Sequence, residues 1–198
     1  MPRWTNNAEK RLRDAAAELF EAHGYEAVTV TAIAEQAGLT RRTFFRYFPD
    51  KREVLFPQTD EIGEAVAQAI NIQPKDADAG VLVGEIITVL VRAGTVITSD
   101  RQAQRKRQTL IQSSPELRER SRTKLATTAA TIESALTTRG EPDAQIIAAV
   151  AVDLLRTAYQ ATLEGDDNAS FAEHVKRART ALRSFDSYSR LPAPVSDP

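Results

Sequence analysis

The segment GLTRRTFFRYFPDK, residues 38–51, combines basic, hydroxyl and aromatic side chains in a pattern that could bind DNA. Residues 40–52 contain five Lys or Arg and one Asp, whereas the whole chain has a formal net charge of only -1. The guanidinium fork of arginine can bond guanine O6 and N7 together, and a threonine can bond a base edge or touch a thymine methyl group. Positive charge gathered in so short a segment indicates a contact with the phosphate backbone of a duplex.

The side chains expected to reach DNA lie on one face of a short helix and at the N-terminal ends of its neighbours. At 100° per residue, Phe44 and Phe48 share a face that can anchor the helix in a core, while the polar residues point the other way. Helix N-termini also direct free N–H groups toward phosphates. The predicted DNA-binding residues are Thr29, Thr31, Thr40, Arg41, Arg42, Thr43, Arg46, Tyr47 and Lys51.

Three helices must hold this surface in place. Apolar residues at three and four residue steps predict a first helix over about 6–23, and capping residues predict a second over about 30–37. The third begins after Thr40 and is stopped by Pro49. A glycine, Gly38, ends the second helix, and two short helices joined in this way are typical of a helix-turn-helix whose second helix enters the major groove.

The rest of the chain is also predicted to be helical, which makes the protein all-α with about nine helices. Asp50 and Glu53 resemble a capping box that opens a fourth helix, and Pro57 interrupts that helix on its way toward Ile70. The later helices are predicted over about 79–98, from Asp100, from Pro115 to about Thr138, over 143–164, and from Ser170 to about Tyr188.

The stretch YEAVTVTAIAEQAGLTRRTFFRYFPDKREVL, residues 25–55, resembles the DNA-binding signature of the TetR family of bacterial transcriptional regulators. The matching residues are Thr29, Ile33, Ala34, Ala37, Gly38, Thr43, Tyr47, Phe48 and Lys51. The family often has Tyr where Phe45 stands, with its hydroxyl group on a phosphate, and a phenylalanine cannot make that bond. Arg42 also replaces a residue that is frequently small, so both departures bear on the operator sequence.

The resemblance implies a division of the chain and a function. It implies a helix-turn-helix DNA-binding domain over 1–56 and a ligand-binding and dimerisation domain over 57–190, and the composition of 191–198 predicts a disordered tail. The implied protein is a cytoplasmic homodimer that represses transcription from a pseudo-palindromic double-stranded operator. An unidentified small effector, apolar or amphipathic, is expected to release it, and Pro57 is a candidate hinge for that change.

Two apolar stripes in the last two predicted helices support a homodimer independently of the resemblance. Their members recur at three and four residue steps, and neighbouring alanines permit close helix approach. The predicted interface residues are Ile147, Val150, Leu154, Ala158, Ala161, Val175, Ala178, Leu182 and Phe185. The same stripes could instead be buried within one subunit.

Several other classes of protein fit the sequence poorly. The chain has no cysteine and two histidines, so no metal site or cofactor is expected, and it contains none of the motifs that mark common hydrolase, metalloprotease or nucleotide sites. We therefore do not expect an enzyme. The apolar stretch IIAAVAVDLL is too short and too acidic to span a bilayer, so no membrane partner is expected. The alternative function is a helical interaction module that no longer binds DNA.

Overall fold

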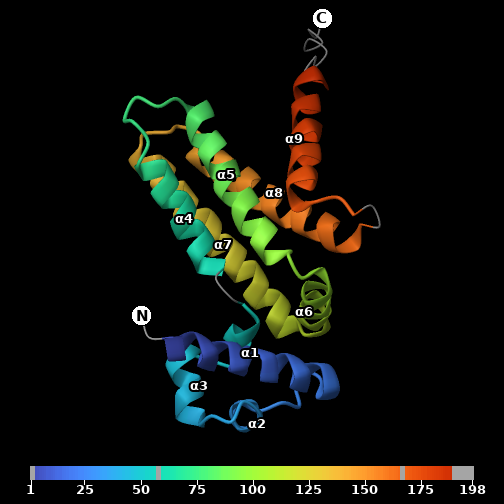
Figure 1. Ribbon diagram of the computed structural model, residues 1–198. Helices are drawn as coiled ribbons and strands as arrows, with labels where there is room; N and C mark the ends of the chain where they lie inside the picture. The colour runs from blue at the N-terminus through green and yellow to red at the C-terminus, as the bar shows by residue number, and fades with distance from the viewer. Residues whose placement is uncertain (1–2, 57–58, 166–167, 189–198) are drawn as a thin grey trace, which may run out of the picture. The chain divides into compact units, whose positions relative to one another are not determined.

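The computed structural model describes residues 3–56, 59–165 and 168–188, without the side chains of 3–7, 59–60 and 185–188, and it confirms an all-α fold (Figure 1). The described residues form nine α-helices and one short 3-10 helix, η1, and contain no strand. The elements in chain order are α1 (Arg3–His23), α2 (Val30–Gln36), α3 (Arg41–Tyr47), η1 (Arg52–Leu55), α4 (Thr59–Asn71), α5 (Ala79–Ile97), α6 (Arg101–Ser113), α7 (Pro115–Thr138), α8 (Ala144–Glu164) and α9 (Phe171–Tyr188).

The helices fall into two compact units that are not consecutive in sequence. The first unit contains the chain up to Glu64 together with Gln102–Thr128, and the second contains Ala65–Arg101 and the chain from Ala129 onward. The first unit therefore includes most of α6 and the first half of α7 beside the three N-terminal helices. Helices α4 and α7 contribute residues to both units.

The core of the first unit lies between α1, α2 and α3 and continues onto α6 and α7. Phe44 and Phe48 are buried as the helical wheel predicts, and their ring centroids lie 5.2 Å apart. Ile111 of α6 and Leu117 of α7 belong to the same cluster of buried side chains. The N-terminal helices thus share one apolar core with two helices that follow them by more than fifty residues, which sequence periodicity does not predict.

The predicted fourth helix is interrupted earlier than expected. Asp50 accepts hydrogen bonds from the backbone N–H groups of Arg52 (2.8 Å) and Glu53 (3.3 Å), but it opens the 3-10 helix η1, and α4 is a separate helix from Thr59. The capping-box prediction is wrong in its second half, because the Glu53 side chain binds α7 instead of turning back to Asp50. Pro57, the candidate hinge, and residues 191–198 of the expected tail lie outside the described residues.

The second unit packs α5, α8 and α9 together. Helix α5 buries one face through Leu82, Ile86, Leu90 and Gly94. Helices α5 and α8 are both long and apolar enough to cross a membrane by length and composition alone, and the stretch IIAAVAVDLL, which is too short to do so, is only part of α8. In this fold both helices pack against α9, and α8 contributes many residues to the core.

Candidate nucleic-acid interface

The N-terminal ends of α2 and α3 are capped by threonines, as predicted. The hydroxyl oxygen of Thr29 accepts a hydrogen bond from the Ala32 N–H at 3.1 Å, and that of Thr40 accepts one from the Thr43 N–H at 3.1 Å. The hydroxyl groups of Thr40 and Thr43 also lie 2.9 Å apart. Since each cap satisfies an orphan N–H group of the first turn, the start of both short helices is fixed locally.

The turn between α2 and α3 is closed at Gly38 and tied to α1. Gly38 has φ of +63°, a left-handed conformation that favours glycine. The Leu39 N–H donates to the Ala34 carbonyl (2.8 Å) and the Gly38 N–H to the Glu35 carbonyl (2.9 Å), the pair of bonds of a Schellman motif. The guanidinium group of Arg11, which lies on α1, donates a hydrogen bond to the Ala37 carbonyl. The angle between α2 and α3 is therefore set by backbone bonds and by a side chain from a third helix.

Six of the nine predicted DNA-binding residues are exposed, and the other three are partly buried. Thr29, Thr31, Thr40, Arg41, Arg42 and Arg46 are exposed, and Thr43, Tyr47 and Lys51 are partly buried. Helix α3 carries five of them, with Arg42 and Arg46 opposite the buried Phe44, and the Phe45 side chain of the same helix is 45% exposed. Their contact with DNA stays a prediction.

Two of the arginines on α3 are held in place by aromatic rings. The Arg46 guanidinium lies 4.9 Å from the centre of the Tyr47 ring and donates to its hydroxyl group at 3.1 Å. The Arg41 guanidinium lies 5.4 Å from the centre of the Phe45 ring. Stacked guanidinium groups have lost part of their conformational freedom already, so less entropy remains to be lost when they bind.

Lys51 has a structural role that its position in the sequence did not reveal. Its ammonium group donates to the carbonyl oxygens of Tyr25 (2.8 Å) and Val28 (3.0 Å) and lies 4.0 Å from the centre of the Tyr25 ring. Two of its three N–H donors therefore order the loop before α2. Burial raises the pKa of the Tyr25 hydroxyl, so this phenol is neutral at physiological pH.

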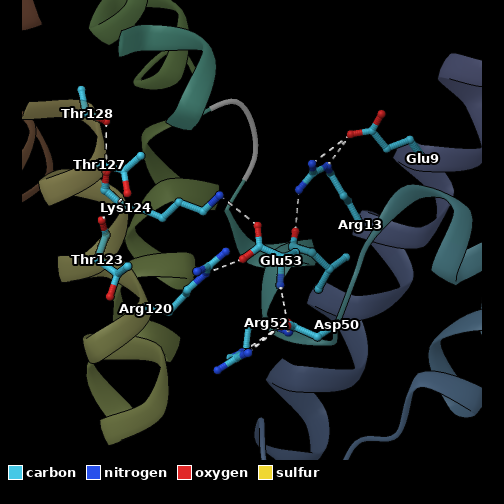
Figure 2. A network of polar contacts seen from close by, with 11 residues as sticks. Glu9, Arg13, Asp50, Arg52, Glu53, Arg120, Thr123, Lys124, Thr127 and Thr128 are labelled. Carbon is cyan, nitrogen blue, oxygen red and sulfur yellow. Dashed lines mark hydrogen bonds and ion pairs between the residues drawn. The ribbon is translucent and has the colours of Figure 1, made fainter. Parts of the chain in front are cut away.

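An ion cluster between η1 and α7, in which Glu53 and Lys124 are buried, was not predicted from the sequence (Figure 2). The carboxylate of Glu53 on η1 meets the Arg120 Nε at 2.5 Å and the Lys124 Nζ at 3.1 Å. A signal was present, since two cations four residues apart lie on the same face of a helix. Residue types and spacing alone do not identify Glu53 as their partner.

Comparison with known proteins shows similarity in the N-terminal region of the chain. The family model of bacterial regulatory proteins of the tetR family matches residues 12–56, which extend from α1 to the residue after η1. The HTH-type transcriptional regulator TcmR of Streptomyces glaucescens is 44% identical over 69 residues, which are 33% of this chain and 30% of that protein. Residues 12–56 match the DNA-binding region of the TetR family.

Solved structures of TetR-family proteins resemble this chain over most of its length. A TetR-family regulator from Streptomyces coelicolor A3 aligns with a TM-score of 0.55 and 17% identity over 94% of this chain and 98% of its own. FadR of Thermus thermophilus, a TetR-family transcriptional repressor in complex with lauroyl-CoA, aligns with a TM-score of 0.52 and 19% identity over 95% and 100% of the two chains. At these identities the similarity to solved structures shows the fold alone. The match to TcmR covers only 30% of the length of that protein.

The predicted dimer residues occupy different environments. Leu154, Ala158 and Val175 are buried within the chain itself, with 8%, 1% and 4% of their surfaces exposed. Val150 and Leu182 are exposed at 38% and 40%. Ile147, Ala161 and Ala178 are partly buried, and the side chain of Phe185 lies outside the described residues. The interface stays a prediction, and the exposed residues are the ones available to a second chain.

Proposed function

We propose that this chain is a ligand-responsive transcriptional repressor that binds a pseudo-palindromic DNA operator as a homodimer. In this proposal residues 1–56 bind the operator, and residues 57–190 bind the effector and form the dimer. The observation that carries the proposal is the face of α3, where Arg42 and Arg46 are exposed directly opposite the buried Phe44 and Phe48.

The chemistry of that face suits a major groove. The groove admits an α-helix, and an arginine that bonds guanine bidentately contributes roughly 1–3 kcal/mol of discrimination between bases. Arg42 and Arg46 are one turn apart on α3, so both can reach the floor of the groove, while Arg41 and Tyr47 at the edges of the face suit phosphate contacts.

A homodimer is the arrangement that supplies a second reading helix. Two recognition helices that enter successive major grooves lie about 34–36 Å apart, and their two-fold symmetry matches a pseudo-palindromic operator. On α8, Ile146 and Val150 are exposed at 64% and 38%, and Leu182 on α9 is exposed at 40%. These apolar side chains support a dimer contact through α8 and α9.

A small apolar or amphipathic effector is the proposed signal. Helix α5 carries apolar side chains beyond those that its neighbours bury, among them Val81 and Val96, which are exposed at 43% and 69%. The FadR structure holds lauroyl-CoA, an amphipathic molecule, in a protein of the same fold. An effector that prefers a conformation with unsuitable spacing would lower operator affinity by its differential affinity for the two states.

The test is selection of an operator from a random duplex library by the purified wild-type chain. We expect a two-fold symmetric site, bound with a log affinity that falls against log salt by about 0.9 for each phosphate neutralised. Arg42→Ala and Arg46→Ala should each weaken binding by roughly tenfold or more, as loss of a base contact predicts. The matched control is Arg122→Ala, which removes an exposed arginine from α7. Failure to enrich any sequence would overturn the proposal and favour an interaction module.

A further inference from the structure

The ion cluster at Glu53 joins η1 to α7 and includes two buried charged side chains, Glu53 and Lys124 (Figure 2). One carboxylate oxygen of Glu53 binds Arg120 and the other binds Lys124, at 2.5 and 3.1 Å. The side chains of Glu53 and Lys124 are only 10% and 8% exposed. All three residues belong to the first unit, and Figure 2 shows the two cations reaching Glu53 from successive turns of α7.

A carboxylate whose two oxygens bind two different cations restricts the orientation of η1 on α7 as well as the distance between them. Burial of a charge is costly unless it is paired and its remaining acceptor sites are bonded. Here each oxygen has its own cation, so rotation or sliding of η1 along α7 would break at least one bond. The pair of bonds therefore favours one angle between η1 and α7.

The apolar packing and the exposed ion pairs that join α6 and α7 to the N-terminal helices are less directional than this cluster. Ile111 and Leu117 add apolar area to the core, and apolar burial has no preferred angle. The ion pairs Arg52–Glu116 (3.3 Å) and Lys106–Glu21 (2.7 Å) have side chains that are 35% to 58% exposed. Exposed pairs of this kind contribute little and tolerate movement.

The 3-10 helix that carries Glu53 is bonded to its surroundings on both sides. Arg13 of α1 donates to the Val54 carbonyl at 2.7 Å, and Arg107 of α6 donates to the Leu55 carbonyl at 2.5 Å. Asp50 fixes the start of η1 through its bonds to the next backbone N–H groups. A change in the position of Glu53 relative to α7 would thus be passed to α1 and to the end of α3.

We propose that Glu53 is a positioning residue that fixes the angle of the DNA-reading helices on α7 and so sets the half-site spacing that the dimer accepts. The inference rests on the proposed function, because spacing has meaning only for a dimer on a two-fold operator. Residues 115–128 of α7, which include Arg120 and Lys124, belong to the first unit. Arg120 and Lys124 act through Glu53 and do not themselves contact DNA.

The experiment uses the operator selected by the wild-type chain and copies with one or two base pairs inserted or removed between the half-sites. Each base pair moves a half-site by about 3.4 Å and rotates it by about 35°. Wild type should bind the altered copies at least about tenfold more weakly than the selected operator. For Glu53→Gln, the affinities for the selected operator and for the altered copies should be much closer to each other. Its affinity for a single half-site should stay within about twofold of wild type.

Two variants separate positioning from general damage. Glu116→Gln breaks the exposed pair with Arg52 between the same helices, and it should keep the wild-type spacing preference. Lys124→Met leaves Glu53 with Arg120 and should reduce the preference in the same direction as Glu53→Gln. The double variant should be no worse than Glu53→Gln, because residues of one network are not additive. If Glu53→Gln lacks a cooperative melt, Lys124→Met carries the test by the same criteria.

The outcomes are distinguishable. A folded Glu53→Gln chain that keeps the full wild-type spacing preference overturns the inference and leaves the proposed function intact. Equal loss of half-site and operator affinity also overturns it, since that result shows a damaged reading surface. If wild type selects no two-fold site, the proposed function fails and the inference fails with it. Loss of spacing preference alone supports the positioning role.

Discussion

Gly94→Ala should destabilise the second unit, because α5 and α9 approach each other closely at this glycine. A Cβ atom at Gly94 would lie 2.2, 2.3 and 2.5 Å from three ring carbons of Phe171, and Phe171 is 2% exposed. Ordinary contact begins at 3.4 Å, so the ring or the helix would have to move by more than 1 Å. A buried aromatic ring has little room for such a movement.

The expected magnitude follows from two opposing effects. Overpacking a well-filled core costs typically about 1–3 kcal/mol, and this overlap lies at the upper end of that range. Replacing glycine by alanine within a helix gains about 0.8–1 kcal/mol. We therefore expect a net loss of about 2 kcal/mol, which lowers the Tm of a chain of this size by roughly 4–8 °C.

The assay is thermal and urea unfolding followed by far-UV circular dichroism at a fixed protein concentration. Gly84→Ala is the matched control, because it lies on the same helix and a Cβ atom there meets nothing within 4 Å. The control should be as stable as wild type or more stable by up to about 1 kcal/mol. Phe171→Leu should recover part of the loss when combined with Gly94→Ala. Equal stability of Gly94→Ala and Gly84→Ala would refute the predicted close contact.

Two further predictions concern the N-terminal helices. Phe45→Tyr should raise operator affinity by about threefold to tenfold. An exposed phenol at this position on α3 can bond a phosphate oxygen, and such a bond contributes roughly 0.5–1.5 kcal/mol. Unchanged affinity in an anisotropy titration would contradict this prediction. The hydrogen bonds from Arg52 hold the pKa of Asp50 below its ordinary value, so Asp50 stabilises the fold above its unfolded-state pKa and loses that effect as pH falls through the folded-state pKa. Asp50→Asn should therefore destabilise the chain near neutral pH, and the variant should lose less stability in acid than wild type does. Urea unfolding from acidic to neutral pH measures both effects. Parallel stability profiles of the two chains against pH would count against this prediction.

Local features of the sequence predicted most of the helix ends. The threonine caps of α2 and α3 and the glycine turn between them depend on neighbours within five residues, so residue types alone reveal them. The burial of Phe44 and Phe48 follows in the same way from their one-turn spacing. Consequently the accessible face of α3 could be described before the structure was known.

Contacts between distant residues could not be predicted in this way. Glu53 lies 67 residues from Arg120, and its spacing from Asp50 equally suits a local capping box. The approach of Phe171 to Gly94 depends on how α5 and α9 cross. On α8, periodicity identifies an apolar stripe but not the neighbour that covers it, and Leu154 and Ala158 are covered by the chain itself.

The most direct test of the account is a hydroxyl-radical footprint of the wild-type chain on its selected operator. Two protected patches are expected on one face of the duplex, separated by one helical turn, about 34–36 Å, or a multiple of it. Both patches should disappear together in the combined Arg42→Ala and Arg46→Ala chain at concentrations that protect DNA with wild type. A single patch, or protection that survives both substitutions, would contradict the claim that α3 reads DNA as part of a symmetric pair.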